Sequence, residues 1–249
     1  MKNPVLKVLW LIYIICVWYP LGIIATILCA VTTWVGCTLG SDRVWGFYPG
    51  MIWSKFMCIL AWCKVSVKGK ENIRKGQSYV FASNHTSIYD VFLIYGYIGV
   101  PFKWIMKKEI ATWPFIGWAC KAAGFLFINR QKGREAFQTL QAAKGVFTGG
   151  VSLVVFPEGT RTRNGEIGKF KRGAFEIAKA VELPIIPMRI DGGFQVMPHG
   201  KFYPVPGRLN LTILPEVEFH PADHDDEFVQ IEKIRELIVN SCGVEELRS

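Results

Sequence analysis

Residues 78–90 have the sequence Ser-Tyr-Val-Phe-Ala-Ser-Asn-His-Thr-Ser-Ile-Tyr-Asp, which combines a strand pattern with a candidate catalytic pair. The apolar run 78–83 predicts a buried strand. His85 follows it in a loop, and Asp90 comes five positions later, in the first turn of a helix capped by one of the intervening hydroxyl residues. The order of strand, loop and helix predicts that His85 lies at the carboxyl end of a strand in an open α/β sheet.

His85 and Asp90 have the chemistry of a general base and the carboxylate that orients it. An imidazole titrates at about pH 6.5 and accepts a proton at neutral pH, and a carboxylate on its other nitrogen stabilises the imidazolium. In one continuous helix the two side chains would lie roughly 140° apart, so His85 must precede the helix for them to meet. The alternative is that His85 caps a helix and that Asp90 is a solvated acid in its first turn. Residues 84–86 also match a glycosylation sequon, but nothing else in the sequence indicates export.

The composition predicts a membrane segment joined to a globular domain. Of the 249 residues 51% are hydrophobic and 20% are charged, and the mean hydropathy is +0.25. Residues 101–175 hold 13 Lys and Arg against four Glu, a balance of +9, whereas residues 216–249 hold ten acids against three bases, a balance of −7. The basic middle region predicts an anionic partner such as phospholipid headgroups, a phosphorylated substrate or an acidic carrier. No nucleic-acid-binding module is recognisable.

The seven cysteines include no C-x-x-C pair, and the chain has four histidines. This pattern predicts neither a disulfide framework nor a metal site, and it favours a reducing compartment.

The amino-terminal quarter predicts a membrane anchor. Between Lys7 and Asp42 there are 34 consecutive uncharged residues, more than the roughly 20 that a helix needs to cross a bilayer core. Pro20 interrupts the run, which leaves one kinked helix or two shorter helices open. With the second apolar stretch, 45–63, the region 1–63 forms a predicted two-helix anchor with tryptophans near the headgroups. A cleaved signal peptide is the alternative, but the run is too long for one.

From residue 64 onward, short apolar runs alternate with helical patterns, as is typical of an α/β fold. We predict that 64–249 is one domain, an open mixed sheet flanked by helices. The predicted strands are 64–67, 79–83, 102–106, 124–128, 152–156, 185–190 and 209–216, and the predicted helices are 87–96, 114–122, 133–148, 173–181 and 226–241.

The segment Phe156-Pro-Glu-Gly-Thr-Arg161 directly follows a predicted buried strand. Its proline ends the strand and its glycine frees the backbone, so Glu158, Thr160 and Arg161 are presented on a loop. An arginine can hold a phosphate bidentately, and a carboxylate can accept hydrogen bonds from hydroxyl groups. An ordinary polar turn is the alternative. The segment lacks the spacing of a P-loop.

Two further blocks, Gly124–Arg130 and Leu183–Ile190, flank this segment in the sequence. Together with His85-x-x-x-x-Asp90 and the segment 156–161, they resemble, in this order, the glycerolipid acyltransferase family, and most closely its bacterial 1-acylglycerol-3-phosphate acyltransferases. The resemblance covers residues 60–215. One departure is Asn129, where many members carry aspartate.

The resemblance implies transfer of a fatty acyl group from acyl-CoA or acyl carrier protein to the free hydroxyl of 1-acylglycerol-3-phosphate (lysophosphatidic acid). The product would be phosphatidic acid, made during phospholipid synthesis at the cytoplasmic face of the cell membrane. The thioester is a co-substrate, and no cofactor or metal is implied. The implied catalytic residues are His85 and Asp90, and the implied acceptor-binding residues are Arg130, Glu158, Gly159, Thr160 and Arg161, with Lys107 or Lys108.

Three alternatives remain open. A lipid-ester hydrolase using the same pair would need a G-x-S-x-G nucleophile elbow, which the sequence lacks. A non-catalytic membrane-surface binding protein would need no catalytic pair. Within the enzyme interpretation, the acceptor could be another lysolipid, such as an acylated amino acid.

Overall fold

Seven strands form one sheet in the order β1-β7-β6-β2-β5-β3-β4 in the computed structural model, which describes residues 3–128, 138, 139 and 141–241. The central strands β6, β2, β5, β3 and β4 are parallel, whereas β7 is antiparallel to β6 and parallel to β1. The predicted mixed sheet is confirmed, and each of the seven predicted strands overlaps an observed strand. The strands are β1 Cys63–Lys68, β2 Val80–Ser83, β3 Phe102–Lys107, β4 Leu126–Ile128, β5 Ser152–Val155, β6 Ile185–Asp191 and β7 Gly207–Ile213.

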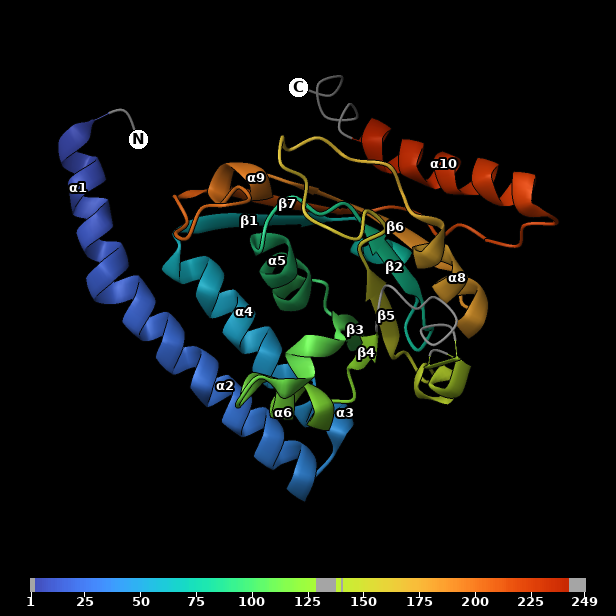
Figure 1. Ribbon diagram of the computed structural model, residues 1–249, viewed down its shortest axis with the longest axis horizontal. Coiled ribbons are helices and arrows are strands. Elements are labelled where there is room, and N and C mark those ends of the chain that lie inside the picture. Colours follow the sequence, from blue (N-terminus) through green and yellow to red (C-terminus); the bar gives the residue numbers. More distant parts are fainter. Residues whose placement is uncertain (1–2, 129–137, 140, 242–249) are drawn as a thin grey trace.

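Helices cover both faces of the sheet, because successive side chains of a strand point to opposite faces (Figure 1). On β2, Phe81 belongs to the core that also holds residues of α4 and α5, whereas Val80 and Ala82 belong to the core shared with α8 and α10. These helices are α4 Tyr48–Leu60, α5 Tyr89–Tyr97, α8 Arg172–Val181 and α10 His224–Asn240, with the shorter α6 Ile116–Ala122 and α9 Gly193–Val196 beside them.

Two predicted elements differ from the structure. The strand predicted from Gly124 begins at Leu126, since Gly124 has φ +69 and ends the preceding turn. The predicted helix 133–148 falls partly outside the described residues, and its carboxyl end is the 3-10 turn Lys144–Val146. Further 3-10 turns lie at Lys70–Asn72 and Lys108–Thr112.

The amino-terminal segment forms one continuous helix of 36 residues, Pro4–Leu39, and contains an 18-residue stretch with a mean hydropathy of 2.3. It consists of α1 Pro4–Tyr13, a π-helical turn Ile14–Trp18 and α2 Tyr19–Leu39. The π turn ends just before Pro20, where the helix loses one backbone donor. Of the two alternatives, the sequence therefore forms the single long helix, and among the described helices only this one is long and apolar enough to cross a membrane.

The second helix of the predicted anchor, α4, follows the short α3 Asp42–Trp45 and has 13 residues. At 1.5 Å per residue it is about 20 Å long, too short for a bilayer core of roughly 30 Å. It packs on α2, where Gly22 faces Met57, and on α5, where a Cβ on Gly96 would stand 3.2 Å from the backbone nitrogen of Lys55. The two-helix element therefore lies against the sheet domain rather than apart from it (Figure 1).

Candidate active site

The carboxyl ends of β2, β5, β6 and β3 lie at one edge of the sheet, since these strands are parallel neighbours. His85 follows β2, the segment 156–161 follows β5, and Gly193 follows β6. Ligand sites of open α/β sheets form at such an edge. Segments far apart in the sequence therefore meet at His85.

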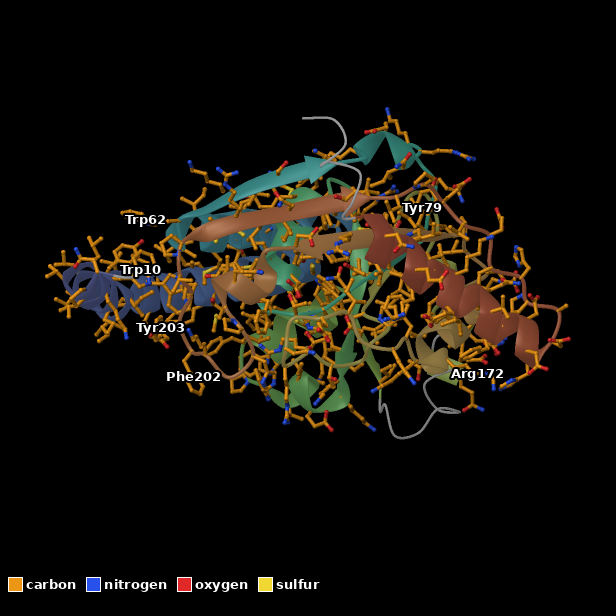
Figure 2. All side chains as sticks on the ribbon, turned by 90° about the horizontal axis from the view of Figure 1, so that it is seen from above. Trp10, Trp62, Tyr79, Arg172, Phe202 and Tyr203 are labelled. Carbon is orange, nitrogen blue, oxygen red and sulfur yellow. The ribbon has the colours of Figure 1, made fainter. Side chains whose placement is uncertain are left out.

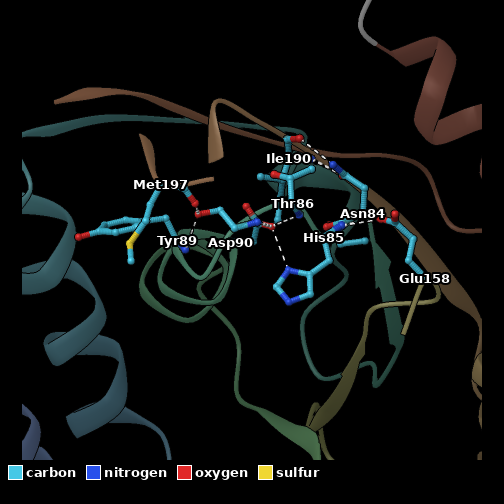
Figure 3. A network of polar contacts seen from close by, with 10 residues as sticks. Asn84, His85, Thr86, Tyr89, Asp90, Glu158, Ile190 and Met197 are labelled. Atoms are coloured by element: carbon cyan, nitrogen blue, oxygen red, sulfur yellow. Dashed lines mark hydrogen bonds and ion pairs between the residues drawn. The ribbon is translucent and has the colours of Figure 1, made fainter. Parts of the chain in front are cut away.

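His85 and Asp90 are in direct contact, with Nδ1 of His85 3.0 Å from Oδ2 of Asp90 (Figure 3). The same carboxylate oxygen accepts hydrogen bonds from the backbone N–H groups of Thr86 at 2.5 Å and Ser87 at 2.7 Å. The predicted geometry, a histidine in the loop and an aspartate in the first turn of the helix, is what the structure shows. If the carboxylate accepts from Nδ1–H, Nε2 is the nitrogen left to take a proton.

The two side chains differ in access to solvent, as a base and its orienter should. The side chain of Asp90 is 0% exposed and that of His85 is 14% exposed. The carboxylate is therefore fixed inside the protein while the ring reaches the surface of the site.

Gly193 closes the site behind Asp90. Oδ1 of Asp90 is buried and accepts no hydrogen bond from a described residue, and a Cβ on Gly193 would stand 2.1 Å from it. A glycine Cα–H can make a weak contact with this oxygen where no larger residue fits. Gly193 is not among the predicted site residues, although a Gly-Gly pair directly after an apolar strand is a signal of close backbone approach.

An aromatic stack supports the imidazole. The rings of His85 and Phe156 lie parallel, with centroids 3.9 Å apart and an interplanar angle of 12°, and Phe156 stacks on Trp104 at 5.8 Å. The stack restricts rotation of the imidazole. Trp104 lies on β3 and Phe156 directly follows β5, so only the order of strands in the sheet reveals this contact.

Glu158 links the loop that carries His85 to the loop after β5 by hydrogen bonds. Its Oε1 accepts from the backbone N–H of His85 at 2.7 Å, and its Oε2 accepts from that of Gly168 at 2.9 Å. Thr162 completes the link by donating its backbone N–H to the carbonyl of His85 at 3.0 Å. Burial raises the pKa of Glu158, and the two backbone donors partly offset that shift.

Asn84 joins the end of β2 to β6. Its side-chain amide donates to the carbonyl of Ile190 at 2.9 Å and accepts from the N–H of Ile190 at 2.8 Å. The residue is 2% exposed, and both of its polar side-chain atoms are engaged, so it is not a glycosylation acceptor. It fixes the position from which His85 leaves the sheet.

Four of the predicted acceptor-binding residues, Glu158, Gly159, Thr160 and Arg161, lie on the segment 156–161 after β5. Arg161 is half-buried and forms no hydrogen bond or ion pair with another described residue. Gly159 has φ +75, as the predicted loop requires, and Thr160 next to it is exposed. Lys107 and Lys108 are exposed at the end of β3. Arg130 lies outside the described residues.

Lys171 is a further cation beside this loop, and it is not among the predicted site residues. A Cβ on Gly159 would stand 3.1 Å from its Nζ, and its backbone N–H donates to the carbonyl of Pro157 at 2.9 Å. The ammonium group therefore lies close to the backbone of the loop that carries Arg161. Among the described residues, no cluster of three or more His, Cys, Asp or Glu side chains could hold a metal ion.

An apolar cavity of about 370 Å³ lies between the long helix, α4, α5 and the segment 114–116. Its lining includes Trp18, Trp53, Met57, Phe92 and Phe115. Phe92 lies on α5, the helix whose first turn holds Asp90. The cavity suits a hydrocarbon group rather than a polar ligand.

Comparison with known proteins agrees with this geometry. A family model described as Acyltransferase matches residues 64–191. The chain is 32% identical over 159 residues to a chloroplastic 1-acyl-sn-glycerol-3-phosphate acyltransferase of Arabidopsis thaliana, covering 64% of this chain and 44% of that protein. It is 34% identical over 166 residues to 1-acyl-sn-glycerol-3-phosphate acyltransferase alpha of Mus musculus, and the match covers 66% of this chain and 58% of the mouse protein.

The match to Saccharomyces cerevisiae 1-acyl-sn-glycerol-3-phosphate acyltransferase is 33% over 174 residues, covering 68% of this chain and 54% of the yeast protein. The chain thus spans about half the length of these relatives. The crystal structure of the 1-acyl-sn-glycerophosphate acyltransferase PlsC from Thermotoga maritima has the same fold, with a TM-score of 0.76, 24% identity and 98% coverage of both chains.

Proposed function

Because this chain belongs to the acyltransferase family, we propose that it transfers a fatty acyl group from a thioester to the free hydroxyl of 1-acylglycerol-3-phosphate, giving phosphatidic acid. The observation that carries the proposal is the contact between the partly exposed His85 and the buried Asp90 at the carboxyl edge of the sheet. The names of the relatives support the acceptor. Membership of this family also favours an enzyme over a non-catalytic membrane-binding protein.

In the proposed reaction, Nε2 of His85 removes the proton from the acceptor hydroxyl as its oxygen attacks the thioester carbonyl. The carbon–sulfur bond then breaks, and the thiolate leaves and takes the proton from the imidazolium. Asp90 stabilises the imidazolium through Nδ1–H, and its position is fixed by two backbone donors. The acyl group passes directly to the acceptor, so no acyl-enzyme is needed.

We propose that Arg161 binds the phosphate of the acceptor, with help from Lys107 or Lys108 and from Arg130. Arg161 is supported by its place one residue before Thr162, whose backbone contacts that of His85, and by its lack of a partner among the described residues. An arginine presents a fork of donors that matches a phosphate. Lys171 supplies a further positive charge beside the same loop.

The role expected for Glu158, holding the glycerol, remains a prediction. Substrate binding by its neighbours Gly159 and Thr160 also remains a prediction. Both carboxylate oxygens of Glu158 already accept backbone hydrogen bonds from other segments. We propose that its main role is to position the backbone of His85. Any contact with the glycerol then uses the remaining lone pairs of these oxygens.

We propose that the protein is held at the cell membrane by the region 1–63, with the domain 64–249 on the cytoplasmic face. The long helix exposes apolar side chains such as Val5, Leu9 and Ile15, which water disfavours. The basic region 101–175 suits an anionic leaflet. The protein should stay in the membrane fraction through a carbonate wash, and release by that wash would contradict the anchor.

The acyl donor and the acceptor are tested with purified protein, acyl-CoA and acyl carrier protein thioesters, and a panel of lysolipids. We expect phosphatidic acid from lysophosphatidic acid and slow turnover of acceptors without a phosphate. Faster acylation of an acylated amino acid would establish the alternative acceptor. Release of free fatty acid without acyl transfer would instead indicate a hydrolase.

A further inference from the structure

The loop 197–206, between α9 and β7, carries a large apolar side chain at its exposed tip. Phe202 is 78% exposed, and among the large apolar side chains that the structure describes only Leu39 is more exposed. The loop is held in place below this tip, because Val205 donates its backbone N–H to the carbonyl of Val196 at 2.9 Å and Pro204 is buried. Phe202 therefore projects from a loop whose backbone is held in place.

Two hydrogen bonds hold this loop against the long helix. The hydroxyl of Tyr19 donates to the backbone carbonyl of Phe202 at 2.8 Å, and Nε1 of Trp10 donates to that of Pro204 at 2.9 Å. Both donors lie in the amino-terminal half of the helix. Phe202 is thus placed beside Tyr19, in the half of the helix that also exposes Val5, Leu9, Ile12 and other apolar side chains.

Trp62 occupies the opposite flank of the same helix. Figure 2 shows Trp62 and Phe202 on the two sides of the long helix near Trp10. Trp62 is 62% exposed, and its Nε1 donates to the hydroxyl of Tyr13 at 3.2 Å. Each aromatic residue has an exposed lysine near it in the sequence, Lys64 beside Trp62 and Lys201 beside Phe202.

Exposed aromatic rings with neighbouring lysines are typical of the interface between a bilayer and water. The rings enter the headgroup layer and the ammonium groups pair with lipid phosphates. A helix with apolar side chains on much of its surface has little preference for its rotation in a membrane. Contacts on both flanks would fix that rotation and, with it, the orientation of the domain.

We propose that the loop 197–206 is a second membrane-contacting element and that Phe202 enters the lipid interface beside the long helix, opposite Trp62. The proposal rests on the membrane association proposed above. Burial of a phenylalanine side chain favours partition into an apolar phase by roughly 10- to 100-fold. The loop therefore adds to membrane binding and sets the position of the active site over the lipid.

The direct test places the photoreactive residue benzoylphenylalanine at one position of the full chain at a time, in liposomes of phosphatidylcholine and phosphatidylglycerol. The positions are Phe202, Ile12 on the long helix and Phe228, a 68% exposed residue of α10 that serves as the matched control. After irradiation, mass spectrometry measures the lipid adduct. We expect adducts at positions 202 and 12, with at least tenfold less at position 228.

If position 12 gives adducts and position 202 gives no more than the control position 228, the loop proposal is wrong and the anchor proposal stands. The absence of adducts at both positions would overturn membrane association and the loop proposal with it. Neither result bears on the acyl transfer itself, which is measured separately with acceptors in solution.

A second measurement compares Phe202→Ser with Phe228→Ser. The hydrogen bond from Tyr19 is to the backbone of Phe202, so Phe202→Ser keeps it. We expect Phe202→Ser to lower the rate with a long-chain acceptor in liposomes by about tenfold, with an unchanged rate for a short-chain acceptor in solution. Equal losses with both acceptors would overturn the proposal.

Discussion

The Cα of Gly193 packs against Oδ1 of Asp90, so closely that a Cβ on Gly193 would stand 2.1 Å from this oxygen. The other oxygen, Oδ2, faces His85 and two backbone N–H groups. The carboxylate is therefore fixed from one side by the loop after β2 and from the other by the turn after β6. Its position depends on backbone that is about a hundred residues away in the sequence.

We predict that Gly193→Ala lowers kcat by roughly 100-fold, because a shift of about 1 Å in a catalytic group has an effect of that size. KM should change little, since the segment 156–161, where we propose that the acceptor binds, is not touched. Steady-state kinetics measure both constants. The control is Gly173→Ala in α8, where an added Cβ meets nothing within 4 Å. Native kcat in Gly193→Ala would show that the carboxylate has room to adjust.

The sequence predicted most of the fold because its strands are short apolar runs bounded by turn residues. It also predicted that His85 and the segment 156–161 follow strands. Their meeting depends on β2 and β5 being neighbours, which the pairing of Val80 with Leu153 shows.

The contacts that the sequence did not predict all cross between segments. The stack of Phe156 on His85, the hydrogen bond from His85 to Glu158 and the packing of Gly193 on Asp90 each need the register of neighbouring strands. Local sequence patterns indicate secondary structure, but they do not specify which residues of neighbouring strands lie side by side. The same limit explains why the backbone contacts of both Glu158 oxygens were not predicted.

Glu158 should give the stability of the protein a measurable pH dependence. Burial raises its pKa above the ordinary value of about 4.3. Between that value and the raised one, the native state holds a proton that the unfolded chain has lost. The free energy of unfolding therefore decreases as the pH rises through this window.

Glu158→Gln should remove this contribution, so its thermal midpoint in detergent should fall less between pH 4 and pH 7 than that of the native protein. The exposed Glu166→Gln, on the same loop, is the control. Parallel pH curves for the native protein and Glu158→Gln would contradict the raised pKa.

Arg161→Lys should weaken the use of a phosphorylated acceptor, because lysine cannot reproduce a bidentate contact. Loss of a charge-assisted hydrogen bond costs about 1.5 to 3 kcal/mol, or roughly 10- to 150-fold in kcat/KM. With an acceptor that lacks the phosphate, the substitution should lower kcat/KM only a little. Arg163→Lys, an exposed arginine two residues later, is the control. Equal losses with both acceptors would mean that Arg161 supports the loop instead of binding the phosphate.

Asn84→Asp tests the link between β2 and β6. The new carboxylate can accept from the N–H of Ile190 but cannot donate to its carbonyl, so one buried hydrogen bond is lost. We expect a loss of about 1 to 3 kcal/mol in the free energy of unfolding, which lowers Tm by several degrees in a chain of this size. Asn210→Asp on β7, at an exposed position, should change Tm little. Equal Tm changes would show that the link to Ile190 is not required.

The central claim is that His85 is the general base of a direct acyl transfer. It is tested by measuring thiol release from acyl-CoA by native protein and by His85→Ala, each with and without lysophosphatidic acid. We predict acceptor-dependent release by the native protein, no burst without acceptor, and a loss of at least about 100-fold in His85→Ala, with Tm and membrane binding unchanged. Near-native, acceptor-dependent release by a folded His85→Ala variant would contradict the account.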